Sequence, residues 1–114
     1  SSKACDPCIV IPGTLVEIAG VGVLLSGESG VGKSDTVLGL LDRGHRLIAD
    51  DAVELYLCSG RLHGRSPEQL RGLVAIRGLG ILNVCQIFGP ECLCSERPVD
   101  LEIALELRPP PAEP

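Results

Sequence analysis

A glycine-rich octapeptide in the first third of the chain has the residue types and spacing of a phosphate-binding loop. It matches the pattern G-x-x-x-x-G-K-S/T in full and consists of Gly27, Glu28, Ser29, Gly30, Val31, Gly32, Lys33 and Ser34. Glycine tolerates the backbone angles that turn successive N–H groups toward an anion. In this pattern the lysine reaches the β- and γ-phosphates and the Ser34 hydroxyl ligates magnesium. The motif therefore predicts a nucleotide phosphate site, and a ligand-free glycine-rich turn is the alternative.

Two adjacent carboxylates, Asp50 and Asp51, follow the apolar segment 45–49. An acidic residue at the end of a strand is where P-loop enzymes hold their magnesium ion. Neighbouring side chains on an extended chain point in different directions, so one carboxylate can serve the metal while the other acts as general base toward a hydroxyl. The alternative is a solvated acidic end of a strand.

The six cysteines allow a second kind of chemistry. They are Cys5, Cys8, Cys58, Cys85, Cys92 and Cys94. Cys5 and Cys8 have C-x-x-C spacing, and with Cys92 and Cys94 they would supply four thiolates for zinc, although the second pair is one residue shorter than zinc-ribbon spacing. Plain reduced thiols are the favoured reading. Cys58 and Cys85 are expected to pack as small hydrophobic residues.

Composition limits the possible partners. The chain has 114 residues, a net charge of −5 and only two aromatic residues, Tyr56 and Phe88. A single small domain with a core of Leu, Val, Ile and Ala is expected. The acidic balance and the lack of stacking platforms argue against nucleic-acid binding. The longest uncharged apolar run, 18–26, is too short to span a bilayer, and no signal-peptide pattern opens the chain, so a cytoplasmic protein without membrane partners is expected.

The elements that must position the loop can be read around it. Alternating residues 14–18 and the apolar run 21–26, separated by Ala19 and Gly20, predict a hairpin that leads into the loop. Residues 34–43 have helical spacing of apolar side chains, and Gly44 follows as a C-cap signal.

The rest of the chain continues with short strands and few helices. Strands are expected over 45–49, 52–58, 73–76 and 99–107, and a turn at 59–60. A helix capped by Ser66 with Pro67 as its first residue and a short helix over 81–88 are also expected. Residues 1–9 are expected to be a leader, and the Pro-rich tail 108–114 is expected to be disordered. The fold class predicted is α/β, a mixed β-sheet that carries the phosphate loop.

Two stretches resemble one family. The segment GVGVLLSGESGVGKSDTVLGLLDRGHRLIADDAVEL (20–55) and the segment IRGLGILNV (76–84) are similar to the catalytic domain of HPr kinase/phosphorylase. The resemblance covers 10–107, and the second segment carries it, because a phosphate loop alone occurs in many families. The segment GRSPEQLRGL (64–73) looks like the compact, single-domain forms that lack an N-terminal regulatory domain.

The resemblance implies a fold related to phosphoenolpyruvate carboxykinase and a magnesium-dependent enzyme, commonly hexameric. Such enzymes use ATP, or pyrophosphate in some members, to phosphorylate a serine of the phosphocarrier protein HPr, and reverse this by phosphorolysis. Carried onto this chain, the loop 27–34 would bind the nucleotide phosphates and Lys33 would be catalytic. Ser34 and Asp50 would serve the metal, and Asp51 would accept the proton of the serine hydroxyl.

The sequence departs from the family at informative positions. Pro12 stands where the family has a catalytic histidine, and Ala75 stands where it has a magnesium-binding glutamate. The family's C-terminal helices, which bring an active-site arginine, have no counterpart in these 114 residues. Candidate replacements for the arginine are Arg71 and Arg77. His45 and His63 are candidate replacements for the imidazole, although solvated surface histidines are the simpler interpretation of both.

Three hypotheses follow. The first is an active kinase that phosphorylates an HPr-like phosphocarrier on serine in the regulation of carbon metabolism. The second is a weakened or inactive nucleotide-binding regulatory module, favoured by the departures at Pro12 and Ala75. The third is a cysteine-cluster metal or interaction domain. A homo-oligomer is expected under the first two.

Overall fold

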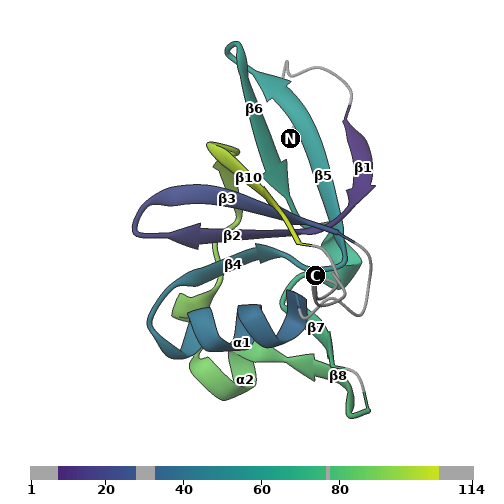
Figure 1. Cartoon of the computed structure of the whole chain (residues 1–114), viewed down its shortest axis with the longest axis vertical. Coiled ribbons are helices and arrows are strands. Elements are labelled where there is room, and N and C mark those ends of the chain that lie inside the picture. Colours follow the sequence, from purple (N-terminus) through teal and green to yellow (C-terminus); the bar gives the residue numbers. More distant parts are fainter. Residues whose placement is uncertain (1–7, 28–32, 77, 106–114) are drawn as a thin grey trace, which may run out of the picture.

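The computed structural model describes residues 8–27, 33–76 and 78–105. Within these ranges ten strands, two α-helices and two short 3-10 helices follow one another (Figure 1). In chain order they are β1 (Ile9–Pro12), β2 (Thr14–Ile18), β3 (Val21–Ser26), α1 (Lys33–Asp42), β4 (Arg46–Ala49), β5 (Ala52–Cys58), β6 (Arg61–Arg65), η1 (Glu68–Leu70), β7 (Leu73–Ile76), β8 (Gly80–Asn83), α2 (Val84–Phe88), η2 (Pro90–Cys92), β9 (Glu96–Pro98) and β10 (Leu101–Ala104).

Two four-stranded sheets and a separate hairpin form the framework. The first sheet has the order β1-β5-β6-β9, the second has the order β10-β3-β2-β4, and β7 pairs with β8. Only β10 and β3 run parallel among these pairs, so the second sheet is mixed. The mixed sheet that the sequence predicted is thus confirmed, and it is accompanied by a second, antiparallel one.

The two sheets share one apolar core. Its buried members are Leu15, Leu24, Ile48, Ala49, Val53 and Leu55. The sheets approach so closely that a methyl group at Gly64 would collide with the side chain of Leu15. Glycine at this position therefore lets β6 lie against β2.

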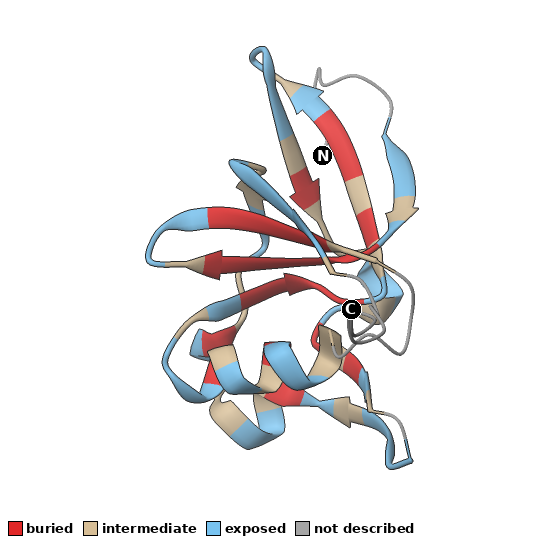
Figure 2. Cartoon of the chain, in the orientation of Figure 1, coloured by how far each residue is buried: buried red, intermediate tan, exposed pale blue. Residues whose placement is uncertain are grey.

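A second core lies between the mixed sheet and the helices. Val37 and Leu41, four residues apart on α1, are buried against Val16 of β2 and Val74 of β7. Figure 2 shows buried segments on β2, β3 and β4 and single buried positions in α1 and at the start of α2. This packing fixes the start of α1 relative to the ends of the strands.

The elements predicted around the loop are confirmed. β2 and β3 pair as an antiparallel hairpin, with Thr14 opposite Leu25 and Ile18 opposite Val21. α1 begins at Lys33, and Gly44 follows it with φ of 92°, the left-handed conformation that glycine adopts after a helix. The strands predicted at 45–49, 52–58 and 73–76 are present as β4, β5 and β7.

The prediction of one helix over 81–88 is wrong in its first half. Residues Gly80–Asn83 form β8, in which Ile81 lies opposite Ala75 of β7. The helix starts only at Val84, because the Asn83 side chain accepts a 3.0 Å hydrogen bond from the backbone N–H of Cys85. A side-chain acceptor at this position is a typical N-cap.

The helix expected after Ser66 is a single 3-10 turn, and its N-cap is Pro67 without a side-chain cap. The Ser66 hydroxyl donates instead to the backbone oxygen of Pro67 at 2.8 Å. The last strand, β10, is shorter than the predicted 99–107, of which 106–107 lie outside the described residues. β6 and β9 were not predicted. β6 forms a hairpin with β5 across the predicted turn at 59–60, and β9 pairs with β6 about 35 residues away in the chain.

The predictions for the two ends fall largely outside the described residues. The leader predicted over 1–9 overlaps β1, which begins at Ile9, and the tail 108–114 lies outside the described residues. No helix within the described ranges has the length and apolar character needed to cross a bilayer.

Candidate functional site

The two described ends of the glycine-rich loop lie between β3 and α1. Glu28, Ser29, Gly30, Val31 and Gly32 lie outside the described residues. Gly27 follows β3, with φ of 138°, and Lys33 opens α1. The Lys33 ammonium group donates a 2.5 Å hydrogen bond to the backbone oxygen of Gly27. The Lys33 ammonium group therefore lies beside Gly27, the first residue of the loop, at the N-terminal end of α1.

Ser34 connects the start of α1 to β7. Its hydroxyl donates a 2.7 Å hydrogen bond to the backbone oxygen of Ala75, 41 residues away. Ser34 is half-buried, so the oxygen remains near the surface of the molecule. A hydroxyl in this place can exchange its carbonyl partner for a cation.

Asp50 directly follows β4 and is buried, with 5% of its surface exposed. Its carboxylate accepts a 2.9 Å hydrogen bond from the Thr14 hydroxyl and a second one from the backbone N–H of Ala75. Burial raises the pKa of the Asp50 carboxyl, and the neighbouring Asp51 charge raises it further. The two hydrogen bonds and the Lys33 charge act in the opposite direction on this pKa.

Asp51, the next residue, is exposed to solvent, whereas Asp50 is buried. Asp51 has φ of 74°, which is uncommon for a residue other than glycine. Its backbone oxygen accepts a 3.3 Å hydrogen bond from the N–H of Gly13, which holds the turn in place. A non-glycine residue in this conformation costs about 1–2 kcal/mol, and such costs gather at functional sites.

Ala75 joins the parts of this site through its backbone. Its N–H contacts the Asp50 carboxylate and its oxygen accepts the Ser34 hydroxyl. Ser34 and Asp50 therefore both contact the backbone of the same residue, Ala75 of β7. The charge of Lys33 is close enough to lower the pKa of the Asp50 carboxyl. The structure brings together the described residues that the sequence selected: Gly27, Lys33, Ser34, Asp50 and Asp51.

Both departures from the family pattern border the same turn. Pro12 lies opposite Ala52, the residue after Asp51, in the pairing of β1 with β5. Ala75 contacts Asp50 and is itself exposed. Two positions separated by more than half of the chain therefore converge on the paired carboxylates.

Sequence reasoning missed Thr14. It is fully buried and is the first residue of β2, where a polar residue before an apolar strand was the only local signal. Thr14 and Asp50 are 36 residues apart in the chain, so no pattern of neighbouring residues predicts their hydrogen bond.

The candidate replacements for the missing family residues lie elsewhere in the part of the chain that is described. The His63 ring is half-buried and stacks on Tyr56, with centroids 5.6 Å apart. Half-buried His45 follows α1. Arg71 donates a 3.0 Å hydrogen bond to the Ser95 hydroxyl. Arg77 lies outside the described residues.

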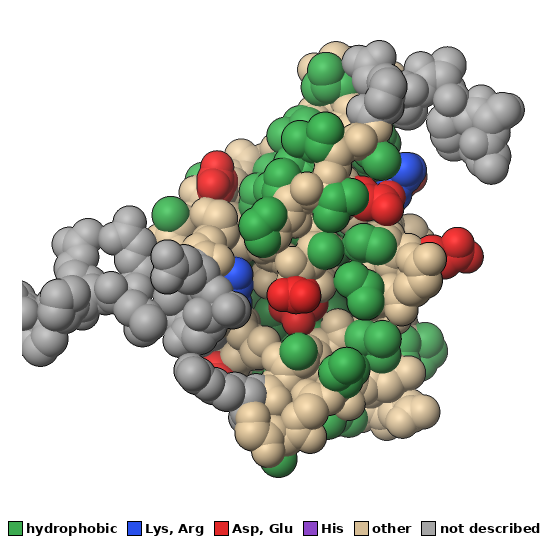
Figure 3. Space-filling model, turned by 90° about the vertical axis from the view of Figure 1, so that its right-hand side faces the viewer, with side chains coloured by type: hydrophobic (Ala, Val, Ile, Leu, Met, Phe, Trp, Pro, Cys, Tyr) green, Lys and Arg blue, Asp and Glu red, His purple; other side chains and the backbone are tan. Residues whose placement is uncertain are grey.

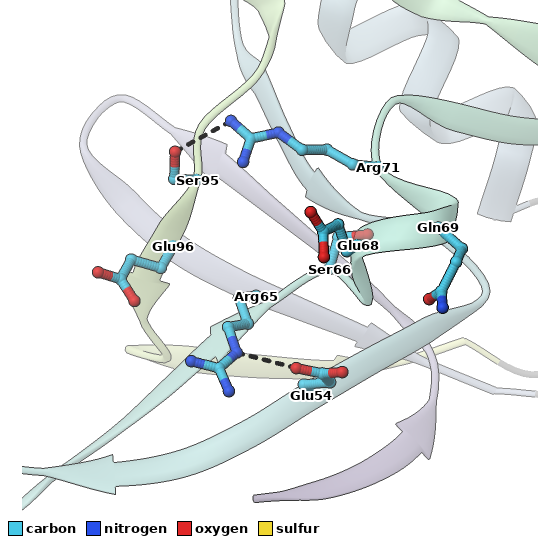
Figure 4. Close-up of a pocket in the computed structure, with 8 residues that line it drawn as sticks. All are labelled: Glu54, Arg65, Ser66, Glu68, Gln69, Arg71, Ser95 and Glu96. Carbon is cyan, nitrogen blue, oxygen red and sulfur yellow. Dashed lines mark hydrogen bonds and ion pairs between the residues drawn. The ribbon is translucent and has the colours of Figure 1, made fainter. Parts of the chain in front are cut away.

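A polar pocket of about 590 Å³ lies beside the site and not within it. Its lining comes from β5, β6, η1 and the segment around β9, and consists of Glu54, Arg65, Ser66, Glu68, Gln69, Arg71, Ser95 and Glu96 (Figure 4). The Arg65 guanidinium is 2.8 Å from the Glu54 carboxylate and lies over the Tyr56 ring. The pocket therefore has charges of both signs that are already partly paired.

No disulfide is formed by the cysteines within the described ranges, which are Cys8, Cys58, Cys85, Cys92 and Cys94. Cys92 is buried, and Cys58 and Cys85, for which packing as small hydrophobic residues was expected, are half-buried. Burial raises the pKa of the Cys92 thiol. Among the described residues no group of three or more His, Cys, Asp and Glu side chains is placed to hold a metal ion, and Cys5 lies outside them.

Comparison with known proteins agrees with this geometry. Residues 5–111 match the family described as "HPr Serine kinase C-terminal domain". The HPr kinase/phosphorylase of a Thermoanaerobacter species is 50% identical over 101 residues, and that of Caldicellulosiruptor bescii is 52% identical over 101 residues. These alignments cover 88% of this chain, and 33% and 32% of the two relatives.

A solved structure shares the fold. The protein described as the Hpr(Ser) kinase/phosphatase from Coxiella burnetii superposes with a TM-score of 0.81 at 34% sequence identity, over 84% of this chain and 58% of that one. The chain spans about a third of the length of the curated relatives it matches. With the family match, the identity and the superposition in agreement, the chain belongs to the HPr serine kinase C-terminal domain family.

Proposed function

We propose that this chain transfers a phosphoryl group from a nucleotide to a serine of an HPr-like phosphocarrier protein. The observation that carries the proposal is the Asp50–Asp51 turn, in which a buried carboxylate and an exposed one stand side by side. The buried one is joined through Ala75 to Ser34 at the start of α1. The relatives are named HPr kinase/phosphorylase, which supports the choice of substrate.

The donor groups of the site fit a magnesium–nucleotide complex. The Ser34 hydroxyl and the Asp50 carboxylate are oxygen donors, the type that Mg²⁺ prefers, and both approach the same residue of β7. The loop 27–34 would hold the phosphates, with Lys33 at its described end. Magnesium with ATP, or with pyrophosphate as in some members of the family, would supply the phosphoryl group and neutralise its charge.

Each described residue then has a distinct task. Lys33 offers a point charge to the phosphates once it leaves the Gly27 oxygen. Asp50 is oriented by Thr14 and Ala75 and would hold the metal side of the site. Asp51 is exposed and would accept the proton of the serine hydroxyl as that oxygen bonds to phosphorus and the bond to the leaving phosphate breaks. In the reverse direction the same carboxyl would return the proton.

A second candidate function is a nucleotide-binding module with weak or no transfer activity. Pro12 and Ala75 favour it, because both border the carboxylate turn and neither has an ionisable side chain. Loss of an acid–base partner costs about 10²- to 10⁴-fold in rate. A cysteine-cluster domain remains the third prediction, and zinc released on alkylation of Cys5 and Cys8 would support it.

One pair of measurements separates the first two functions. Calorimetry with and without magnesium measures nucleotide affinity, and a transfer assay with HPr measures phosphorylation of serine. The proposed function expects magnesium-dependent binding, phosphorylated HPr, and loss of binding in Lys33→Ala. Binding without transfer would favour the regulatory module. If Lys33→Ala binds ATP as tightly as the parent chain, both functions are wrong.

The remaining expectations are part of the same proposal. A homo-oligomer, a hexamer as in the family, would cover the edge strand β10, whose Leu101 and Ile103 are exposed. A cytoplasmic location and the lack of nucleic-acid binding remain predictions from composition. Light scattering on the purified chain tests the oligomer.

A further inference from the structure

Two thiols lie together outside the candidate site. Cys85 belongs to α2 and Cys92 ends η2, and a side-chain hydrogen bond joins the two sulfur atoms. In Figure 1, α2 lies in the lower part of the molecule, to the left of the β7–β8 hairpin. Figure 3 shows the right-hand side of that view, where hydrophobic side chains lie next to acidic ones. The proposed phosphoryl transfer uses neither sulfur atom.

The chain between the two cysteines folds back on itself. The N–H of Gly89 donates a 2.9 Å hydrogen bond to the backbone oxygen of Cys85. The N–H of Cys92 donates in turn a 3.2 Å hydrogen bond to the backbone oxygen of Gly89. Gly89 has φ of 90°, a positive value that favours glycine. Two successive helical turns thus bring together cysteines that are separated in the sequence.

Neighbouring strands hold both ends of this segment. The N–H of Val84 donates a 3.0 Å hydrogen bond to the backbone oxygen of Gly72, the residue before β7. The N–H of Cys94 donates a 2.9 Å hydrogen bond to the backbone oxygen of Leu47 in β4. Because its two ends are fixed, the segment 84–94 keeps the sulfur atoms close to each other in the folded protein, which favours a reaction between them.

The two thiols differ in their access to solvent. Cys85 is half-buried, whereas Cys92 is buried in the core that also contains Val74 and Val84. Burial raises the pKa of the Cys92 thiol, and the neighbouring Cys85 raises it further. Cys92 is therefore a protonated and protected thiol in the reduced protein. Cys85 is the sulfur atom of the pair that a small oxidant in solution reaches first.

Cys94 is the alternative partner, because it lies only two residues after Cys92. It packs, however, against the other core, the one between the two sheets. Its thiol donates a 3.4 Å hydrogen bond to the backbone oxygen of Glu96. The partner of Cys92 in the fold is therefore Cys85.

We propose that Cys85 and Cys92 are a redox-sensitive pair that a hydroperoxide converts into a disulfide without rearrangement of the fold. The Cys85 sulfur attacks one oxygen of hydrogen peroxide, the O–O bond breaks, and Cys85 becomes a sulfenic acid while the other oxygen leaves as water with the thiol proton. The Cys92 sulfur then attacks the Cys85 sulfur, the S–O bond breaks, and a second water leaves with the Cys92 proton. Two thiols and one peroxide thus give one disulfide and two waters. The inference does not depend on the proposed phosphoryl transfer.

The test uses the purified, reduced 114-residue chain and hydrogen peroxide as the oxidant. Protease cleavage after glutamate residues, which include Glu91, separates Cys85 from Cys92, so that only a disulfide holds the two peptides together. We expect mass spectrometry to find this cross-linked pair in the oxidised parent chain and a thiol reductant to release it. Cys85→Ser should lose the cross-link. Cys94→Ser is the matched control, because Cys94 is also half-buried, and it should keep the cross-link.

Thermal unfolding tests whether the disulfide fits the fold. The oxidised parent should have a Tm about 5 °C or more above that of the reduced parent, because the cross-link restricts the unfolded chain. Oxidised Cys85→Ser should lack this rise.

Four results would overturn the inference. The first two are a cross-link that is absent from the oxidised parent and one that is lost in Cys94→Ser, which would assign the disulfide to Cys94. The others are a disulfide that joins two chains, and an oxidised parent whose Tm is unchanged or lower, which would show that the disulfide requires a rearrangement. None of these results bears on nucleotide binding or on transfer to HPr.

Discussion

The Thr14 hydroxyl donates a 2.9 Å hydrogen bond to the Asp50 carboxylate, and both residues are buried. Thr14 begins β2 and Asp50 follows β4, so the bond joins two strands that are paired in the mixed sheet. It fixes the direction of a carboxylate that the proposed function places at the metal. It also satisfies a buried charge that would otherwise cost far more than an exposed one.

Thr14→Val should weaken magnesium-dependent nucleotide binding. The bond that is lost goes to a charged group, which is worth about 1.5–3 kcal/mol, so the affinity should fall on the order of tenfold or more. Thr14→Ser keeps the donor and should bind as the parent does. Calorimetry at a fixed magnesium concentration checks this, and equal affinities in the valine and serine variants would show that the bond does not position Asp50.

The raised pKa of Asp50 predicts a pH dependence of stability. The folded state binds the proton of the Asp50 carboxyl more tightly than the unfolded state, in which the pKa is close to its ordinary value of 3.8. The contribution of Asp50 to the free energy of unfolding is therefore greatest below that pH and is lost as pH rises through the raised pKa.

Asp50→Asn removes this titration. The stability of the variant relative to the parent should increase as pH rises across the same window, because only the parent must ionise a buried group. Thermal unfolding of both proteins over that pH range measures the difference. A difference in Tm that does not change with pH would contradict a raised pKa.

Asp51 combines an exposed carboxylate with a left-handed backbone, and these two properties can be separated by substitution. Asp51→Asn keeps a residue that tolerates this conformation and should lower transfer to HPr by about 10²- to 10⁴-fold. Its nucleotide affinity should stay unchanged. Retained transfer in the asparagine variant would remove Asp51 from the role of base.

Asp51→Gly should relieve the backbone cost of the positive φ. We expect the glycine variant to be as inactive as the asparagine variant but more stable than it, by up to about 1 kcal/mol. Chemical unfolding of the two variants makes the comparison directly, since both lack the carboxylate. A glycine variant less stable than the asparagine variant would argue that side-chain contacts of Asp51 outweigh its strain.

Ala75 offers a test by gain of activity. Its side chain is exposed and its backbone already contacts Ser34 and Asp50, so Ala75→Glu would add a carboxylate beside the proposed metal. We expect tighter magnesium binding and faster transfer to HPr. Ala75→Gln, which has the same shape without the charge, is the control. A glutamate variant that matches the glutamine variant would show that the site gains nothing from this ligand.

Elements whose formation depends on patterns among neighbouring residues could be predicted from the sequence. The hairpin 14–26 follows from alternation around a two-residue turn, and α1 follows from helical spacing that ends before Gly44. The segment 81–88 was misjudged because its short apolar run suits either a helix or a strand. The pairing of Ile81 with Ala75 decides for a strand up to Asn83.

The sequence by itself determined which residues are candidates for the chemistry: the motif 27–34, the pair Asp50 and Asp51, and the departures Pro12 and Ala75. Only the tertiary structure decided that Asp50 is buried and Asp51 exposed, that Thr14 and Ala75 hold Asp50, and that both departures meet at one turn. The physical reason is the distance along the chain over which each interaction acts. Turn chemistry and periodicity act over a few neighbouring residues, whereas burial and hydrogen bonds across 36 residues depend on how the strands pair.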